Sequence, residues 1–338
     1  MATKVLLTID TELVWRHHVA GLSWEENFAR TFEAAGVGIP YQLRVLAEHG
    51  LKACFFVDPM PAAAHGLEPV RRMIEPILAA GQEVQLHVHP FWARLAQAER
   101  QGKCPELTSF DADEQRALIE QARDLLVAAG APPPIAFRAG SFAADEATLD
   151  AVRALGLRYD SSHNGCQQPW PSALPIAAAT IAPVGARGVV EIPVTQMEEQ
   201  PGRLRHLQIC AVSFPELRAA LMHARRELHP LVTILSHSFE LATRNGLRVN
   251  RVVQGRFLQL CRFLADNSDT LPTAWFSQLE GLPLGMPARP MPGRTGRKLR
   301  RMAGQFWADA RYERPSEPLT IATGSSILGA EAVLPYVG

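Results

Sequence analysis

The sequence lacks the features that mark exported and membrane-spanning proteins. Its first residues lead directly into an apolar, strand-like stretch, without a basic region, an apolar core and a cleavage site before it. No uninterrupted apolar segment approaches the roughly 20 residues that a membrane span requires. We therefore expect a cytoplasmic protein without a transmembrane segment.

An excess of charge and paired cysteines are also missing. The 338 residues include 34 basic and 34 acidic side chains, so no long-range field favours nucleic acid, and we expect none as a partner. The five cysteines are odd in number and form no C-x-x-C pair, which argues against a thiolate zinc site and a disulfide framework. Free thiols are predicted instead.

Short apolar runs alternate with helix-like segments over most of the chain. The segments between the runs repeat apolar residues at three- and four-residue spacing, and several end at glycine. This alternation favours a parallel sheet with helices outside, and the number of repeats suits a closed or nearly closed barrel. The predicted buried strands lie at residues 5–9, 53–57, 84–88, 135–137, 189–194 and 232–235.

The pattern changes near residue 280, where proline and glycine become frequent and a basic segment follows. We therefore predict a catalytic barrel over residues 1–280. Residues 281–338 are predicted to be a proline- and glycine-rich linker with a basic C-terminal extension.

Polar residues gather where the predicted strands end. Asp10 and Glu12 end the first strand, and His87 and His89 end the third. The two-residue period of a strand aims the members of each pair to the same side. Two histidines and a nearby carboxylate form a three-ligand metal site that leaves a position open for water. Either Glu12 or Asp10 could be the third ligand.

Three further polar residues follow other segments of the predicted sheet. Arg138 follows the fourth strand, where its guanidinium could hold a carboxylate ionised. Asp160 lies in an R-Y-D-S-S segment, and His237 follows the last predicted strand. Each motif alone is weak, because solvated strand ends and core histidines are common. Titratable residues at the ends of five segments of one sheet together indicate an active site.

In this order, these five stretches resemble the five motifs of the polysaccharide deacetylase family, over residues 4 to about 278. The resemblance implies the NodB-homology fold, a distorted (β/α) barrel of about seven parallel strands. The D-T-E sequence at residues 10–12 is similar to the opening motif of the exopolysaccharide-associated branch, which reads D-x-E.

The motifs depart from the usual family pattern at three positions. Thr11 stands where a second aspartate is usual, so Glu12 would substitute as a metal ligand. His89 follows His87 after two residues instead of four, and Gly140 replaces a usual proline.

The resemblance implies metal-assisted hydrolysis that removes an acyl group, such as acetyl, from an amide nitrogen of a sugar or saccharide precursor. Asp10 would be the general base and Arg138 would support it. His237 would protonate the departing amine, and Asp160 would orient His237. The divalent ion, zinc by ligand type with cobalt or nickel as alternatives, would be held by Glu12, His87 and His89.

Three other functions stay open. The first is an amide hydrolase that acts on a small cyclic imide or ureide. A cytoplasmic enzyme cannot reach mature wall polymer, so a sugar substrate would have to be a nucleotide-linked or lipid-linked precursor. Thr11 and the shortened histidine spacing favour a metal-free carbohydrate-binding relative. A glycoside hydrolase that uses Asp10 and Glu12 ranks last, because adjacent positions on one strand poorly bracket a glycosidic bond.

Overall fold

The computed structural model describes residues 2–95 and 105–313. One eight-stranded sheet forms its centre, with the strand order β10-β1-β2-β3-β4-β5-β7-β6. Every neighbouring pair is parallel except β6 with β7, so the predicted barrel of about seven parallel strands is confirmed. The strands are β1 (Lys4–Thr11), β2 (Cys54–Val57), β3 (Glu83–Val88), β4 (Ala136–Ala139), β5 (Tyr159–Asp160), β6 (Val184–Ala186), β7 (Val189–Glu191) and β10 (Leu231–His237).

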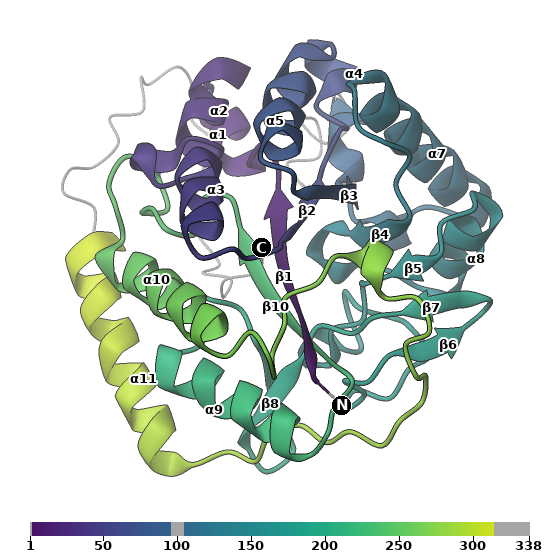
Figure 1. Cartoon of the computed structure of the whole chain (residues 1–338). Helices are drawn as coiled ribbons and strands as arrows, with labels where there is room; N and C mark the ends of the chain where they lie inside the picture. Colours follow the sequence, from purple (N-terminus) through teal and green to yellow (C-terminus); the bar gives the residue numbers. More distant parts are fainter. Residues whose placement is uncertain (1, 96–104, 314–338) are drawn as a thin grey trace, which may run out of the picture.

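Helices surround this sheet (Figure 1). Most of the long helices bury an apolar stripe; in α5, for example, Val70, Met73, Ile74 and Ile77 are buried at three- and four-residue spacing. The long helices are α3 (Ile39–Glu48), α5 (Glu68–Ala79), α7 (Ala112–Ala128), α8 (Glu146–Ala154), α9 (Phe214–Arg226), α10 (Arg251–Asp266) and α11 (Thr295–Ala308). Short helices are α1 (Trp15–Val19), α2 (Trp24–Thr31) and α4 (Ala62–His65).

Brief 3₁₀ turns connect several of these elements. They lie at Ala34–Gly36, Pro90–Trp92, Leu107–Ser109, Gly140–Phe142, Gly165–Gln167 and Phe276–Gln278, and a π-helical turn follows α11 at Asp309–Glu313.

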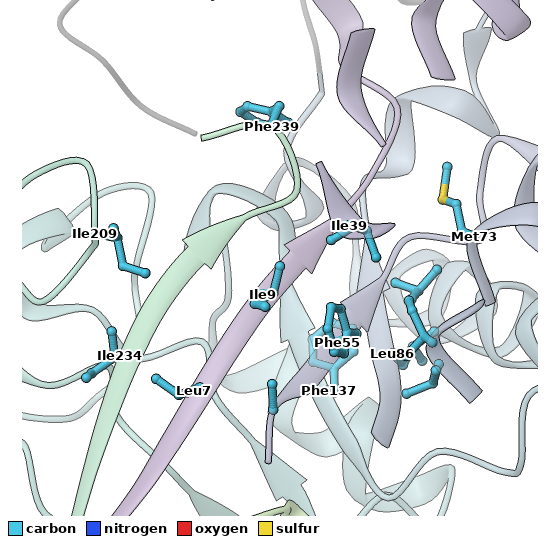
Figure 2. Packing of buried hydrophobic residues seen from close by; sticks show 14 of the residues in the cluster. Leu7, Ile9, Ile39, Phe55, Met73, Leu86, Phe137, Ile209, Ile234 and Phe239 are labelled. Carbon is cyan, nitrogen blue, oxygen red and sulfur yellow. The ribbon is translucent and has the colours of Figure 1, made fainter. Parts of the chain in front are cut away.

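Strand β1 lies in the middle of the core. It pairs with β10 on one side and β2 on the other, and all its residues after Lys4 are buried. Leu7 and Ile9 pack in one cluster with Phe55, Leu86 and Phe137 from the neighbouring strands (Figure 2). Burial of each such side chain stabilises the fold by roughly 1.5–3 kcal/mol. Because both faces of the sheet are covered around β1, most of its strands are rich in apolar residues, which is why the sequence revealed them. The short strands β5 and β6 were not predicted.

The free edge of β10 is covered by irregular chain. The backbone N–H of Ile209 donates to Leu235, and the N–H of Leu235 donates to Leu207. This segment follows a two-stranded hairpin of β8 (Gln196–Gln200) and β9 (Arg203–His206), which the sequence did not predict. The hairpin and residues 207–209 therefore extend the wall of the barrel beyond β10.

The segment between β1 and α3 contains the short helices α1 and α2. Helix α2 begins with a reciprocal cap, in which Ser23 Oγ accepts from the N–H of Glu26 and the Glu26 carboxylate accepts from the N–H of Ser23. The S-x-x-E sequence is the signature of this cap and could have predicted the helix.

The C-terminal helix α11 packs against the barrel through a buried arginine. Arg301 is 4% exposed; its Nε donates to Glu216 of α9, and its Nη2 donates to Glu199 of β8. The opposite face of α11 exposes apolar side chains, namely Leu299, Met302, Phe306 and Trp307. The division of the chain at residue 280 stays a prediction.

In the part of the chain that the structure describes, no helix is long and apolar enough to cross a membrane. Cys54, Cys166, Cys210 and Cys261 are free thiols, and Cys104 lies outside the described residues.

Candidate active site

Glu12, His87 and His89 form a compact group at the carboxyl ends of β1 and β3. One ligand atom from each lies within 4.8 Å of the others. Glu12 Oε2 is 2.5 Å from His89 Nε2 and 3.6 Å from His87 Nε2. The predicted alternation therefore brings the two imidazoles of β3 and the carboxylate of β1 together across the end of β2, which lies between these strands.

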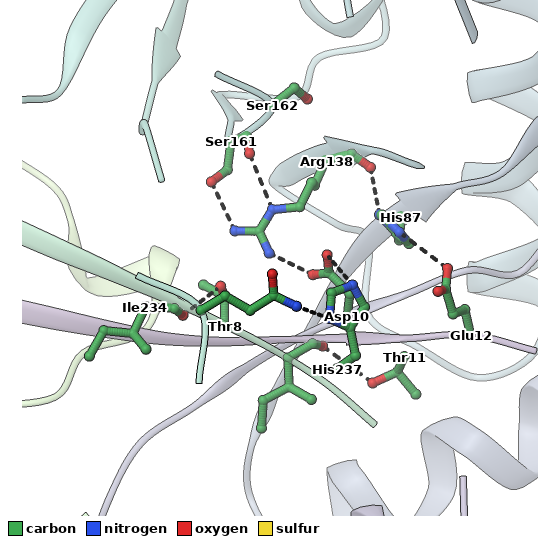
Figure 3. A network of polar contacts seen from close by, with 12 residues as sticks. Thr8, Asp10, Thr11, Glu12, His87, Arg138, Ser161, Ser162, Ile234 and His237 are labelled. Carbon is green, nitrogen blue, oxygen red and sulfur yellow. Dashed lines mark hydrogen bonds and ion pairs between the residues drawn. The ribbon is translucent and has the colours of Figure 1, made fainter. Parts of the chain in front are cut away.

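A hydrogen bond fixes the orientation of His87. Its Nδ1 lies 2.8 Å from the carbonyl oxygen of Arg138, so Nδ1 carries the proton and donates it there (Figure 3). The lone pair of Nε2 is thereby directed toward Glu12. Metal-binding histidines commonly have such a carbonyl partner on the second ring nitrogen, because it fixes the tautomer and the ring.

His89 fits only because residue 140 has no side chain. A Cβ built on Gly140 would lie 2.4 Å from His89 Nδ1 and 2.5 Å from Cε1, closer than real Cβ contacts. The glycine that stands in place of the family's usual proline therefore makes room for the shortened histidine spacing. These two departures from the family pattern have one structural cause.

The electrostatics of the group suit a cation. Burial opposes ionisation of Glu12, but the two histidines hold its pKa well below the usual value. Burial disfavours the charged form of His89, yet Glu12 raises the His89 pKa to about 10. Glu12 Oε2 is buried and accepts no well-aligned hydrogen bond from the described residues. Two imidazoles and one carboxylate with ligand atoms this close together fit a divalent ion such as zinc, which would displace the proton of His89.

Asp10 and Arg138 form a buried ion pair beside this group. Arg138 is fully buried, and its Nη1 donates to Asp10 Oδ1 at 2.5 Å. The remaining guanidinium hydrogens are directed at Ser161, with Nε donating to its carbonyl and Nη2 to its hydroxyl oxygen. Arg138 therefore contacts Asp10, as predicted, and leaves Oδ2 outside this ion pair.

His237 lies on the other side of Asp10, but its partner is not the predicted one. His237 Nε2 is 4.0 Å from Asp10 Oδ2, and Nδ1 is 2.7 Å from Glu240 Oε1. The expectation that Asp160 orients His237 is wrong, because Glu240 follows in the turn after β10 and reaches the ring first. Burial opposes protonation of His237, but Glu240 raises its pKa above the usual value.

Asp160 instead supports the end of β4. Its Oδ1 accepts from the Ser162 hydroxyl at 2.7 Å, and Ser162 Oγ accepts from the backbone N–H of Ala139. Burial and the adjacent charge of Asp160 raise the pKa of Glu191 well above its usual value. This arrangement holds the backbone that carries Arg138.

Two acids near the histidines escaped the sequence reasoning. Asp58 directly follows β2 and is fully buried; its Oδ1 accepts from the N–H of Met60, whereas Oδ2 has no partner among the described residues. Burial raises the Asp58 pKa to about 6, against the effect of His89 and His87. Burial also raises the pKa of Glu106, against His89 and Ser141. The strand-end rule that located Asp10 would have found Asp58, but nothing in the sequence pointed to Glu106.

The turn after β4 is strained at two residues. Ser141 and Phe142 have φ values of 53° and 59°, a region that residues with side chains rarely adopt. Such conformations concentrate at functional sites, where the surrounding structure maintains them. The turn follows Arg138 directly and borders His89 through Gly140.

Solved structures share the fold of this chain. The chain is similar to a provisionally assigned polysaccharide deacetylase from Mycobacterium smegmatis, with a TM-score of 0.52 and 19% identity over 86% of this chain and 95% of that chain. It is also similar to a 4-alpha-glucanotransferase from Thermococcus litoralis, with a TM-score of 0.50 and 11% identity over 82% of this chain and 40% of that chain. At these identities the likeness establishes the fold alone.

A family model matches part of the sequence. Residues 26–159 match the model of the polysaccharide deacetylase family, which confirms the predicted resemblance. The matched segment contains His87, His89 and Arg138, but it excludes the carboxylates of β1 and His237. No curated protein matches the chain. The exopolysaccharide-associated D-x-E branch stays a prediction.

Proposed function

We propose that the chain is a metal-dependent hydrolase that removes an acyl group, such as acetyl, from an amide nitrogen of a sugar or saccharide precursor. The observation that supports this most is one cluster, in which the Glu12, His87 and His89 ligand atoms lie within 4.8 Å of one another. Asp10 and His237 stand beside it. Deacetylation of polysaccharides is the activity that the description of the matching family names.

Glu12, His87 and His89 would hold the divalent ion, with zinc as the first choice and cobalt or nickel as alternatives. When bound, such an ion supplies Lewis acidity to an acyl carbonyl and to water. The hydrogen bond from His87 to the Arg138 carbonyl keeps the coordinating nitrogen directed at the site before any ligand arrives.

Asp10 is the proposed general base. Arg138 engages Oδ1, so the carboxylate keeps its orientation and retains Oδ2 for the proton of the attacking water. A base in this position typically contributes about 10²- to 10⁴-fold to the rate. Arg138 is fully buried and hydrogen-bonded to Ser161, so the partner that holds the Asp10 carboxylate is itself fixed.

His237 is the proposed general acid. Glu240 accepts from Nδ1, which directs Nε2 toward Asp10 and the reacting centre. The raised pKa of His237 keeps the ring protonated until a departing amine nitrogen needs the proton. Asp160 is a positioning residue in this scheme, because it reaches Ala139 through Ser162.

Metal content and turnover test the proposal together. Purified protein should contain about one divalent ion per chain and hydrolyse N-acetylated saccharides. Glu12→Ala should strongly weaken metal binding. Thr11→Ala is the matched control, because Thr11 Oγ1 donates to the carbonyl of Ile9 in its own strand.

The outcomes separate this proposal from its rivals. Stoichiometric metal that survives both Glu12→Ala and the double replacement of His87 and His89 would contradict the ligand assignment. Turnover of cyclic imides or ureides without turnover of N-acetylated sugars would assign the second class of substrate. Saccharide binding without metal would assign a carbohydrate-binding relative.

A further inference from the structure

A large cavity lies next to the proposed general acid. Its volume is about 880 Å³, and Gln208 and Glu240 are among the residues that line it. Gln208 Nε2 is 3.3 Å from His237 Nδ1, and Glu240 Oε1 is 2.7 Å from the same atom. The cavity therefore begins one side chain away from His237, on the edge of the ring opposite Asp10.

Positive charge dominates the lining of this cavity. It contains Arg203 and Arg205 of β9, Arg244 and Arg256, whereas the only acidic residue in the lining, as far as the structure describes it, is Glu240. Glu240 already accepts from His237. Glu199, which lies outside the lining, forms ion pairs with Arg203 and Arg205, and with it the four arginines still exceed the two acidic residues.

The deepest of these arginines is held by neutral groups. Arg256 is 7% exposed, and the hydrogen bonds given for its Nη1 go to the carbonyl oxygens of Ile209 and Cys210. A buried cation is costly unless a negative group compensates it. Arg205 Nε is also buried without a partner among the described residues, although Arg205 Nη2 donates to Glu199. Arg256 therefore keeps a positive charge that an anionic ligand would neutralise.

The type of anion follows from the number of cations. A single carboxylate would bring one negative charge, whereas a phosphoryl or diphosphoryl group brings about two and matches guanidinium geometry through paired hydrogen bonds. Asn250 and Val253 also line the cavity, at the beginning of the 16-residue helix α10. The amino end of a helix adds further positive potential toward an anion.

We propose that this cavity binds the phosphoryl part of a sugar phosphate or of a diphosphate-linked saccharide. Because the cavity lies beside His237, the phosphoryl group would lie on the amine side of the bond that is cleaved. This arrangement rests on the proposed function. The binding of the anion itself does not depend on that function. Gln305 of α11 contributes to the same wall, and the exposed apolar side chains of this helix lie a few residues away.

Binding of inorganic pyrophosphate to the full-length protein is the first test. Calorimetry should detect saturable binding that weakens about tenfold in Arg256→Gln, since loss of a charge-assisted hydrogen bond costs about that much. Arg244→Gln should also weaken the binding of pyrophosphate. Because Arg244 is exposed, this variant can be measured even if the Arg256 variant fails to fold. Arg158→Gln is the control, because Arg158 is exposed and pairs with Glu280 outside the cavity. Equal affinity in all three variants, or no binding, would overturn the proposal.

Substrate comparison is the second test and separates the sources of the phosphoryl group. The arms are a nucleoside diphosphate N-acetylated sugar, a polyprenyl diphosphate N-acetylated sugar in detergent micelles, and a neutral N-acetylated oligosaccharide. At least one phosphorylated substrate should have a KM about tenfold lower than the neutral one, and Arg244→Gln should abolish the difference. Equal KM values in the wild type would reject the phosphoryl site while leaving the hydrolase proposal intact. Arginine-dependent pyrophosphate binding without any acyl hydrolysis would keep the site and reject the hydrolase.

Discussion

The two edges of the His237 ring face environments of opposite character. On the Nε2 side, charged groups touch partners of opposite sign, as Asp10 does with Arg138 and Glu12 with His89. On the Nδ1 side, arginines outnumber acidic residues around an open cavity, although Glu199 pairs with Arg203 and Arg205. The close pairs of the first side hold the proposed catalytic groups in place, whereas the excess positive charge of the second favours an anionic ligand. The first arrangement suits chemistry and the second suits binding.

The largest effect should come from the carboxylate on the Nε2 side. Asp10→Asn keeps the shape of the side chain but cannot accept a proton, so turnover of an N-acetylated sugar should fall by about 10²- to 10⁴-fold. Metal content should stay unchanged. Asp124→Asn, at an exposed position of α7, is the control for a lost carboxylate. Wild-type turnover by Asp10→Asn with its metal in place would remove Asp10 from the role of base.

A smaller effect is expected from the close approach of His89 to Gly140. Gly140→Ala should displace His89 and weaken metal binding by about 10- to 100-fold, the range found when groups that orient metal ligands are lost. Titration with zinc and a competing chelator measures it. Gly185→Ala is the matched control, because an added Cβ there meets no atom within 4 Å. Unchanged zinc affinity in Gly140→Ala would mean that metal binding does not depend on the observed position of His89.

The smallest effect should come from Glu240, at the boundary between the two sides. Its negative charge favours protonated His237, so Glu240→Gln should lower the His237 pKa. Turnover that needs the protonated ring is lost as pH rises through this pKa, so the alkaline limb of kcat should move to lower pH. Glu227→Gln at the exposed end of α9 is the control. An alkaline limb that stays in place would show that another group sets it.

The Nε2 side was largely predictable from the sequence, because it is built at the ends of apolar strands. Period-two alternation after such a strand sets the direction of His87 and His89, and the register of β3 with β4 brings His87 opposite Arg138. The contact of Arg138 with Asp10 followed from the same rule. Asp58 directly follows β2, so the same rule extends to this acid.

The Nδ1 side could not be predicted in the same way. The hairpin strands β8 and β9 read Q-M-E-E-Q and R-L-R-H, without an apolar run or a clean alternation. Strand β5 has only two residues, too short for any periodicity to be recognised. Glu240 lies three residues beyond His237 in an irregular turn, so its contact depends on the fold of that turn. The cavity therefore became visible only from the three-dimensional arrangement.

Arg301 ties the end of the chain to the wall of the cavity. It joins Glu199 of the hairpin to Glu216 of α9, and removal of one partner from a buried ion pair typically costs about 3–5 kcal/mol. A fragment cut at residue 280 would lose both this arginine and Gln305. Substitutions in α11 would therefore change the wall of the cavity and with it the choice of substrate. The proposed catalytic residues, which are remote from α11 in the sequence, would stay unchanged.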